Sequence, residues 1–228
     1  MSWRQKTSNH RFRTMQRITS IVAILLLVGG GYLTYKWFSS GGTMPLPIVG
    51  ASASNQPDVD ETPVSPKQVD DHSVPPTHPR YITISKIGIT KTRIFPVGLA
   101  RDGTVDVPKN IHDAAWYTAS STPGSGNGAV LIDAHNGGYS KDGIFAKLSN
   151  LVIGDAVTIE RGDGKLITYK VVSSVVMSLD EANSHGMKDM MVSAEVGKEG
   201  LSLITCAGSY QAQTKQFDKR VMVRAVRA

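Results

Sequence analysis

The sequence predicts an all-β fold, either a barrel or a sandwich, for residues 80–228. Three observations support this fold class. Short apolar or alternating runs recur along the segment, Gly and Pro residues separate them, and only two short stretches look helical. The chain of 228 residues is long enough for one such domain with appendages.

Eight runs have the length and composition of strands. They are Tyr81–Ile84, Gly88–Ile94, Thr104–Pro108, Ala129–Ala134, Ala156–Arg161, Lys165–Val176, Leu201–Cys206 and Arg220–Val226. The dipeptide Asp163-Gly164 separates two of these runs and is typical of a tight hairpin turn. The helical stretches are Gly143–Asn150 and the residues around Asp180–Ser184, and no internal repeat is visible.

The first 38 residues have the pattern of a membrane anchor. Residues 1–17 carry five basic residues and no acidic one, and residues 18–38 are predominantly apolar. At about 1.5 Å per residue this stretch reaches about 31 Å, enough to cross the hydrocarbon layer. The basic tail indicates a cytoplasmic N-terminus and a single-pass protein at the cell membrane with an extracytoplasmic domain. A cleaved signal peptide is the alternative, but the Ala51-Ser52-Ala53 pattern comes too late for its cleavage site.

Residues 39–79 read as a linker that spaces the domain from the membrane. They hold eight of the eleven prolines and show no apolar periodicity. Such a segment buries too little surface to offset its ordering entropy, so we expect it to be disordered and extended. The alternative is that part of it folds over the active site as a lid. His72 and His78 lie in this segment, and the sequence assigns them no role.

The charge distribution argues against nucleic-acid binding. The formal net charge is +6, of which +5 lies in residues 1–17, while residues 39–79 carry −4 and residues 80–228 carry +4. The basic excess is therefore a juxtamembrane cluster, and no nucleic-acid motif accompanies it.

Three polar residues at the ends of apolar runs could perform nucleophilic catalysis. Cys206 is the only cysteine and ends the run Leu201–Cys206, which makes a disulfide role improbable. His135 follows Ala129–Ala134, and Arg220 opens the last run. A thiol nucleophile, an imidazole acid/base and a guanidinium that stabilises an oxyanion form a complete set. Taken singly, each could instead be a structural strand-end residue.

The sequence around these residues resembles the sortase family of cysteine transpeptidases. Ser202-Leu203-Ile204-Thr205-Cys206 is similar to the sortase signature Thr-Leu-x-Thr-Cys, and Arg220 follows at about the family's spacing. The segments that also read like sortase sequence are Asp102–Pro108, Ala115–Tyr117, Pro123–Gly128, Gly143–Leu148 and Leu151–Asp155. Their order is closest to the class F sortases of Gram-positive bacteria. The chain departs from the family pattern at Ser202, at Ala134 and at Ala207-Gly208, where the family often has Thr, Gly and two glycines.

This resemblance implies an eight-stranded sortase-type β-barrel with short helices and assigns roles to the three residues. Cys206 would attack the carbonyl of an LPxTG-like (Leu-Pro-x-Thr-Gly) sorting signal between Thr and Gly and form a thioester. His135 would act as acid and base, and Arg220 would hold the substrate oxygen. The partners would be sorting-signal peptides of secreted proteins and an amine of a cell-wall peptide or a pilin.

The long segment from Val176 to Gly200 corresponds to the loop that forms one wall of the sortase substrate groove. We expect four of its residues, together with Thr205 beside the nucleophile, to contact substrate: Met177, Leu179, Met187 and Met190. Thioethers adapt to irregular ligands. The alternative is that these side chains only pack beneath their own loop. His185, in the same loop, is the main rival of His135, and His112 is a weaker one.

No metal or cofactor is predicted. One cysteine and scattered carboxylates give no ligand spacing, and calcium binding, known in some sortases, is not established by them. Two alternatives to transpeptidation stay open: a peptidase that uses water as acceptor, and a catalytically silent, surface-anchored binding module. The chain lacks a C-terminal sorting signal, so we do not expect it to be a sorted substrate itself.

Overall fold

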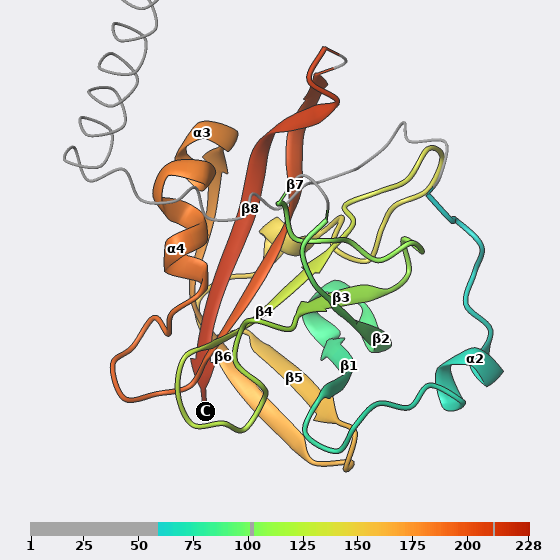
Figure 1. Cartoon of the computed structure of the whole chain (residues 1–228), viewed down its shortest axis with the longest axis vertical. Coiled ribbons are helices and arrows are strands. Elements are labelled where there is room, and N and C mark those ends of the chain that lie inside the picture. The colour runs from blue at the N-terminus through green and yellow to red at the C-terminus, as the bar shows by residue number, and fades with distance from the viewer. Residues whose placement is uncertain (1–58, 101–102, 212) are drawn as a thin grey trace, which may run out of the picture. The chain divides into compact units, whose positions relative to one another are not determined.

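Eight strands close into a barrel in the computed structural model, which describes residues 59–100, 103–211 and 213–228 (Figure 1). The order around the barrel is β1-β2-β3-β4-β7-β8-β6-β5. The strands are β1 (Pro79–Ile84), β2 (Ile89–Val97), β3 (Ala114–Tyr117), β4 (Ala129–Ala134), β5 (Ala156–Arg161), β6 (Leu166–Ser178), β7 (Gly200–Gln211) and β8 (Gln216–Arg227). The predicted all-β class and the eight-stranded barrel are confirmed.

The helices of the described residues are short. They are α2 (Pro66–Asp70), α3 (Leu179–Glu181), α4 (Met187–Met190), the 3-10 turns η1 (Ser85–Ile87) and η2 (Leu148–Asn150), and the π-helical turn η3 (Ala182–Gly186). The segment α3-η3-α4 stands beside β8 in Figure 1 and confirms the helix expected near Asp180–Ser184. In the described part of the chain, no helix combines the length and hydropathy needed to cross a membrane. The predicted basic tail and membrane span, residues 1–38, lie outside the described residues, and so do residues 39–58 of the predicted linker.

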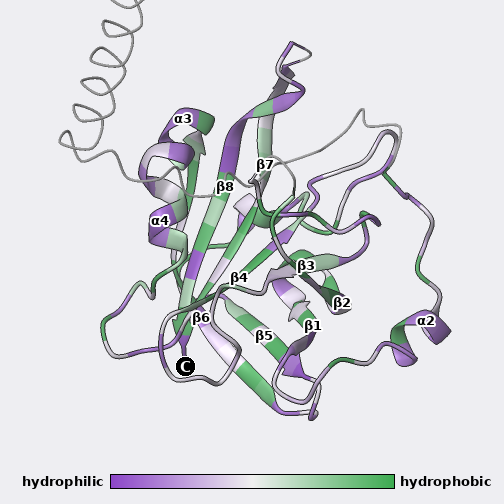
Figure 2. Ribbon diagram, in the orientation of Figure 1, coloured by the Kyte–Doolittle hydropathy of each residue, from purple (hydrophilic) through white to green (hydrophobic). Residues whose placement is uncertain are grey.

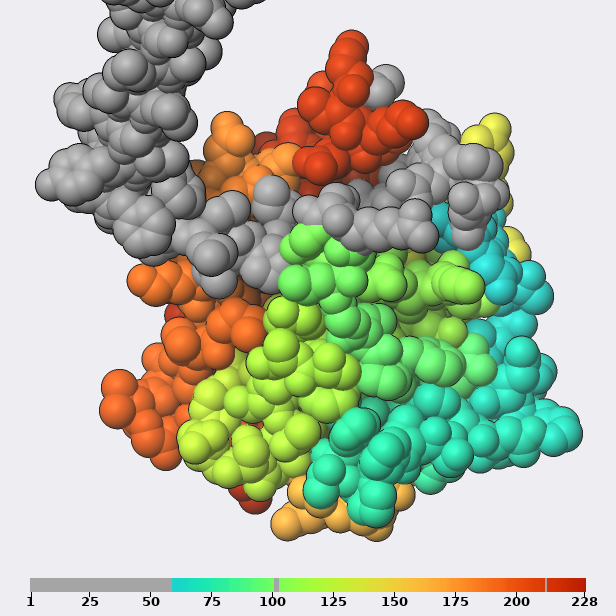
Figure 3. Space-filling model, viewed as in Figure 1, coloured from blue at the N-terminus to red at the C-terminus, as the bar shows by residue number. Residues whose placement is uncertain are grey.

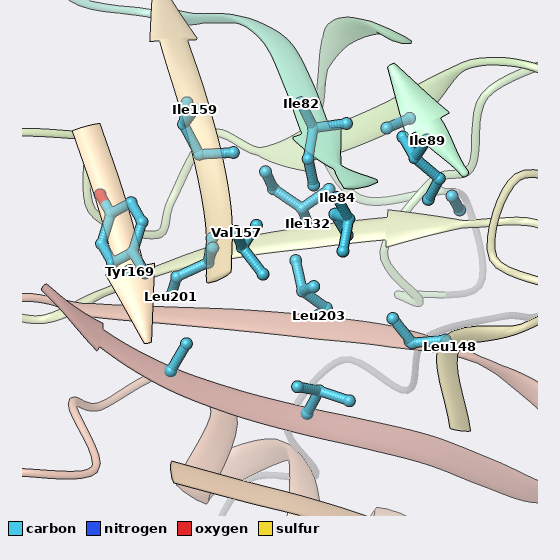
Figure 4. Close-up of a cluster of buried hydrophobic side chains, with 14 of the residues drawn as sticks. Ile82, Ile84, Ile89, Ile132, Leu148, Val157, Ile159, Tyr169, Leu201 and Leu203 are labelled. Carbon is cyan, nitrogen blue, oxygen red and sulfur yellow. The ribbon is translucent and has the colours of Figure 1, made fainter. Parts of the chain in front are cut away.

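The barrel interior is filled by aliphatic side chains from all around the sheet. Figure 4 shows Ile82, Ile132, Val157, Ile159 and others converging from β1, β4 and β5. Alternate residues of each strand point inward, as the two-residue period of a strand requires. Figure 2 shows the resulting apolar character of the central strands. Because the inward-facing side chains pack in the core, the outward-facing side chains of β4, β7 and β8 can form contacts outside the barrel.

One parallel and one antiparallel pairing bring distant segments together. β4 pairs in parallel with β7, with Asp133 opposite Ile204, while β7 pairs antiparallel with β8, with Cys206 opposite Arg220. The carboxyl ends of β4 and β7 therefore lie at the same edge of the sheet. This arrangement places the end of the Ala129–Ala134 run beside the end of the Leu201–Cys206 run.

The third strand lies elsewhere than predicted. Val105 makes only an isolated bridge with Leu99, so Thr104–Pro108 is not a barrel strand. Ala114–Tyr117 takes this place, parallel to β2 and antiparallel to β4. All four of its residues are buried, so it lacks the alternation that identifies a half-exposed strand. Pro108 also removes a backbone donor from the segment that was predicted instead.

The helix expected over Gly143–Asn150 is reduced to η2. The backbone N–H groups of Phe145 and Ile144 donate to the carbonyls of His135 (3.0 Å) and Ile111 (3.1 Å). These donors bond across loops, so they are unavailable for a continuous helical ladder. The segment instead ties the loop after β4 to the loop before β3.

The second half of the predicted linker packs on the barrel. Ser65 caps α2 with a complete capping box, and Pro66 occupies the first helical turn, where proline is compatible with a helix. The Tyr81 hydroxyl donates to the Val69 carbonyl, and the His72 ring is buried with Nε2 2.9 Å from the Ile94 carbonyl oxygen. Residues 59–79 are therefore not an extended spacer. The composition of the segment did not predict this packing, because only a few buried rings and hydrogen bonds to backbone carbonyls hold the segment on the barrel.

Residues 60–62 fasten two loops of the barrel to each other. Asp60 pairs with Asn110 through backbone and side chain, and the Glu61 carboxylate accepts hydrogen bonds from the Ser140 backbone N–H (2.7 Å) and hydroxyl. In Figure 3 this cyan segment lies along one side of the visible face. The loops that it joins, one before β3 and one after β4, are those on either side of His135.

Candidate active site

Cys206 and Arg220 face each other across the β7–β8 pair. They are Cα partners in the antiparallel register, and both are buried, with 5% and 1% of the residue exposed. Cys206 follows Ile204 on the outer face of the barrel wall, because Leu201 and Leu203 take the inner face. The motif residues at 206 and 220 are thus neighbours in space although fourteen positions apart.

The Arg220 guanidinium is oriented by its own strand. Its Nη1 donates to the carbonyls of Phe217 (3.0 Å) and Lys219 (2.8 Å). Its Nη2 is buried and has no hydrogen-bond partner among the described residues. One nitrogen therefore fixes the group, and the other is left as a donor for an acceptor that a ligand would bring.

His135 lies directly after β4, at the same sheet edge as Cys206. The β4–β7 register pairs Asp133 with Ile204, so two further residues along both chains lead to His135 and Cys206. The His135 Nε2 lies 2.7 Å from the Pro108 carbonyl oxygen, which can only accept, so Nε2 donates. This bond and the burial of the ring (4% exposed) fix its orientation.

Thr205 and Ala134 hold the two strand ends together. The Thr205 hydroxyl donates to the Ala134 carbonyl at 2.7 Å, so it braces the backbone immediately before His135. The Ala134 methyl group lies in the barrel core, and its φ is not positive, so alanine is accommodated where the family pattern has glycine. Gly208, in contrast, has φ +80°, and a Cβ there would collide with the Asp218 carboxylate.

A buried acid that the sequence analysis did not single out joins this site. Asp133 on β4 is 4% exposed and interacts electrostatically with both Arg220 and Cys206. Burial raises its pKa to about 8, against the opposing effects of Arg220 and the Ala134 N–H. The signal was present in the sequence, since Asp133 is the one charged residue inside the apolar run Ala129–Ala134.

A model of the sortase domain matches residues 82–228, more than half of the chain. The chain belongs to the sortase family. Sortases are cysteine transpeptidases, and Cys206 is the only cysteine in this one. No relative was found among curated protein sequences.

Solved sortase structures share the fold of this sortase at low sequence identity. Sortase C of Streptococcus pneumoniae is 18% identical with a TM-score of 0.50, covering 77% of this chain and 81% of that one. Sortase C2 of Group B Streptococcus pilus island 1 is 16% identical, with a TM-score of 0.50 and coverage of 81% and 88%. Sortase C1 of the same island is 21% identical with a TM-score of 0.47, and the match spans 65% of this chain and 63% of that one. The family model names the sortase domain without a class, so the class F subtype stays a prediction.

Three of the four loop residues predicted for the sortase groove wall belong to one apolar cluster on the outer face. Met187 and Met190 are buried, and Met177 is half-buried against them. The other members from the sheet and the loops are Val97, Val105, Tyr117, Leu131, Ala182, Met191, Ile204 and Met222. Leu179, half-buried at the start of α3, is not part of the cluster. The methionines thus pack beneath their own loop here, and their contact with substrate stays a prediction.

The rival histidines lie apart from this constellation. His185 is exposed on η3, with Nδ1 2.9 Å from the Ser184 hydroxyl. His112 lines a pocket of about 760 Å³ that the segment around Val69, the β1–β2 turn and residues 141–147 enclose. Neither Cys206 nor Arg220 lines that pocket. Within the described ranges, no group of three His, Cys, Asp or Glu residues is placed to hold a metal ion.

We expect the resting Cys206 to be a neutral thiol. Burial raises its pKa to about 12, Arg220 opposes this shift, and Asp133 adds to it. Alkylation by iodoacetamide follows the thiolate, so its rate should rise about tenfold per pH unit between pH 8 and 10. Arg220→Ala should slow the reaction at each pH, and Asp133→Asn should accelerate it. A rate that levels off near pH 7 in the wild-type protein would contradict this assignment.

Proposed function

We propose that this sortase is a membrane-anchored transpeptidase that cleaves an LPxTG-like sorting signal between Thr and Gly. The acyl group would form a thioester with Cys206 and then pass to an amine of a cell-wall peptide or a pilin. The observation that carries the proposal is the Cys206–Arg220 pair on adjacent strands, with His135 at the same edge. Residues 18–38 would anchor the chain, with residues 1–17 in the cytoplasm and the barrel outside.

The geometry supports a proposed role for each group. Arg220 Nη2 is a buried donor beside the thiol, where the carbonyl oxygen of a scissile bond would gain negative charge. His135 would receive the thiol proton and deliver it to the leaving amine. Because the thiol pKa is raised at rest, thiolate formation would accompany substrate binding rather than precede it.

Substrate recognition would involve the apolar cluster next to the site. Met177, Met187 and Met190 supply adaptable apolar surface, and we retain Leu179 and Thr205 as predicted contacts. The structural study of the Streptococcus pneumoniae sortase C addresses catalysis and pilin substrate specificity. By analogy, a pilin amine is one acceptor to test for this chain.

Product analysis separates transfer from hydrolysis. The full-length chain in detergent is incubated with a fluorogenic LPxTG peptide, with and without triglycine. We expect the triglycine-exchanged peptide to be the main product when the amine is present. Cleavage with no exchange at any amine concentration would favour the peptidase alternative, and an absence of cleavage would favour the silent binding module.

A further inference from the structure

Asp133 presents an unsatisfied acceptor at the active site. Its side chain points to the outer face of β4, as Leu131 does, because Ile132 and Ala134 point into the barrel core. Its Oδ2 is buried and accepts no hydrogen bond from the residues that the structure describes. A buried carboxylate oxygen without a donor is unfavourable by several kcal/mol in general, so such a group is expected to have a partner during function.

The position of Asp133 relative to the thiol follows from the strand register. Asp133 is opposite Ile204, so Cys206 lies two residues further along the neighbouring strand on the same face. Diagonal neighbours of this kind are about 7–8 Å apart, within reach of a group placed between them. The electrostatic coupling of Asp133 to both Cys206 and Arg220 agrees with this proximity.

Two of the unsatisfied buried atoms, on the strands that flank Cys206, are complementary in kind. Arg220 Nη2 is a donor without an acceptor, and Asp133 Oδ2 is an acceptor without a donor. The thioester carbonyl oxygen of an acyl-enzyme supplies an acceptor. The N–H of an amine that approaches the same carbonyl carbon supplies a donor. The thioester and the incoming amine together would satisfy both buried atoms.

We propose that Asp133 binds the incoming amine in the second half-reaction and accepts its proton as the nitrogen attacks the thioester. The inference rests on the function proposed above. The amine nitrogen forms a C–N bond with the acyl carbon, and the C–S bond breaks with its electron pair moving to the Cys206 sulfur. One N–H proton passes to the Asp133 carboxylate and then to the thiolate, which regenerates the thiol and the carboxylate. With its pKa raised to about 8, Asp133 accepts a proton only in its ionised form, which predominates above pH 8 and is a stronger base than an ordinary aspartate.

The test measures how the acyl-enzyme partitions between the amine and water. The full-length chain is loaded with the LPxTG peptide above pH 8, where Asp133 is mostly ionised, and the ratio of triglycine product to hydrolysed product is followed as triglycine is added. For Asp133→Asn we expect acyl-enzyme to form at least as fast as in the wild type, because the substitution removes a charge that raises the pKa of Cys206. The partition ratio should fall by about 10²-fold, the usual contribution of a general base. Because the ratio is measured on acyl-enzyme already formed, it does not depend on the folded fraction.

Three further variants sharpen the result. Asp113→Asn changes an acid that is equally buried but bound to Arg93 by two hydrogen bonds of 2.8 and 2.9 Å, and it should leave the ratio unchanged. Asp133→Ser replaces Asp133→Asn if the latter does not fold, and formate added to Asp133→Ala should restore part of the transfer.

The outcomes separate this inference from the proposed function. A folded Asp133→Asn or Asp133→Ser that transfers to triglycine as well as the wild type would overturn the inference alone. So would a variant that loses acyl-enzyme formation and transfer equally, since Asp133 would then act through Arg220. If the wild type itself formed no acyl-enzyme, the proposed function would fail before Asp133 was tested.

Discussion

Replacing Arg220 with alanine is expected to lower kcat/KM for a sorting-signal peptide by about 10²–10³-fold, the usual effect of removing an oxyanion donor. Nη2 is a buried donor without a partner among the described residues, and the proposed function assigns it to the substrate oxygen. The substitution also removes the positive charge that opposes the raised pKa of Cys206. Both effects act on the attack step, so kcat should fall more than KM rises. Initial rates of peptide cleavage at several concentrations measure the two separately.

Two variants of β8 residues serve as comparisons for the expected loss of kcat/KM. Arg220→Lys keeps the charge but cannot bond two carbonyls and a substrate oxygen with one planar group, so we expect only partial activity. Arg224→Ala removes a guanidinium that lies further along β8 than Arg220 and donates to the Val192 carbonyl at 3.2 Å. It should leave kcat/KM close to that of the wild type. Equal losses for Arg220→Ala and Arg224→Ala would mean that Arg220 has only a structural role.

Replacing Glu199 with alanine is expected to lower the free energy of unfolding by about 3–5 kcal/mol, as for other buried charges that lose their partner network. The Glu199 side chain is 0% exposed. Its carboxylate accepts hydrogen bonds from the backbone N–H groups of Gly124 (2.7 Å) and Gly126 (2.8 Å) and from the Tyr169 hydroxyl. It thereby anchors the loop before β4 to β6 at the start of β7.

Glu195→Ala is the matched control for this prediction. Glu195 forms an ion pair with Lys198, and both side chains are about half exposed, so its loss should change stability by no more than about 1 kcal/mol. Denaturant unfolding followed by circular dichroism compares the two variants. A Glu199→Ala midpoint that matches Glu195→Ala would show that the buried network contributes little.

The sequence predicted most strands because their apolar runs are bounded by Gly and Pro and alternate or stay apolar over their length. It missed β3 because Ala114–Tyr117 is buried on both faces and has no alternation. The helix predicted at Gly143–Asn150 is too long because the backbone N–H groups of Ile144 and Phe145 donate to carbonyls in other loops. Such bonds depend on the tertiary structure. Local pattern carries no information on such long-range bonds.

The site residues were recognisable from sequence in different degrees. Cys206, His135 and Arg220 were found from the ends of apolar runs and the family motif, and the parallel β4–β7 pairing explains why two of these ends meet. Asp133 was overlooked, although an acid within an apolar strand is itself a signal. Its relation to Arg220 depends on strand order, which composition and periodicity do not determine.

Residues 59–79 show more clearly that composition alone does not predict whether a segment packs on the domain. Eight prolines predicted an extended linker, yet residues 59–79 dock on the barrel through His72, Val69 and Glu61. A handful of specific hydrogen bonds can order a proline-rich segment without apolar periodicity.

The most direct test of the central claim is the intact mass of the full-length chain mixed with an LPxTG peptide in the absence of an amine. We expect a covalent adduct with the mass of the acyl fragment through Thr, located on Cys206 by fragmentation and absent from Cys206→Ala. An adduct that persists in Cys206→Ala, or peptide cleavage that continues unchanged in that variant, would contradict the assignment of Cys206 as the nucleophile.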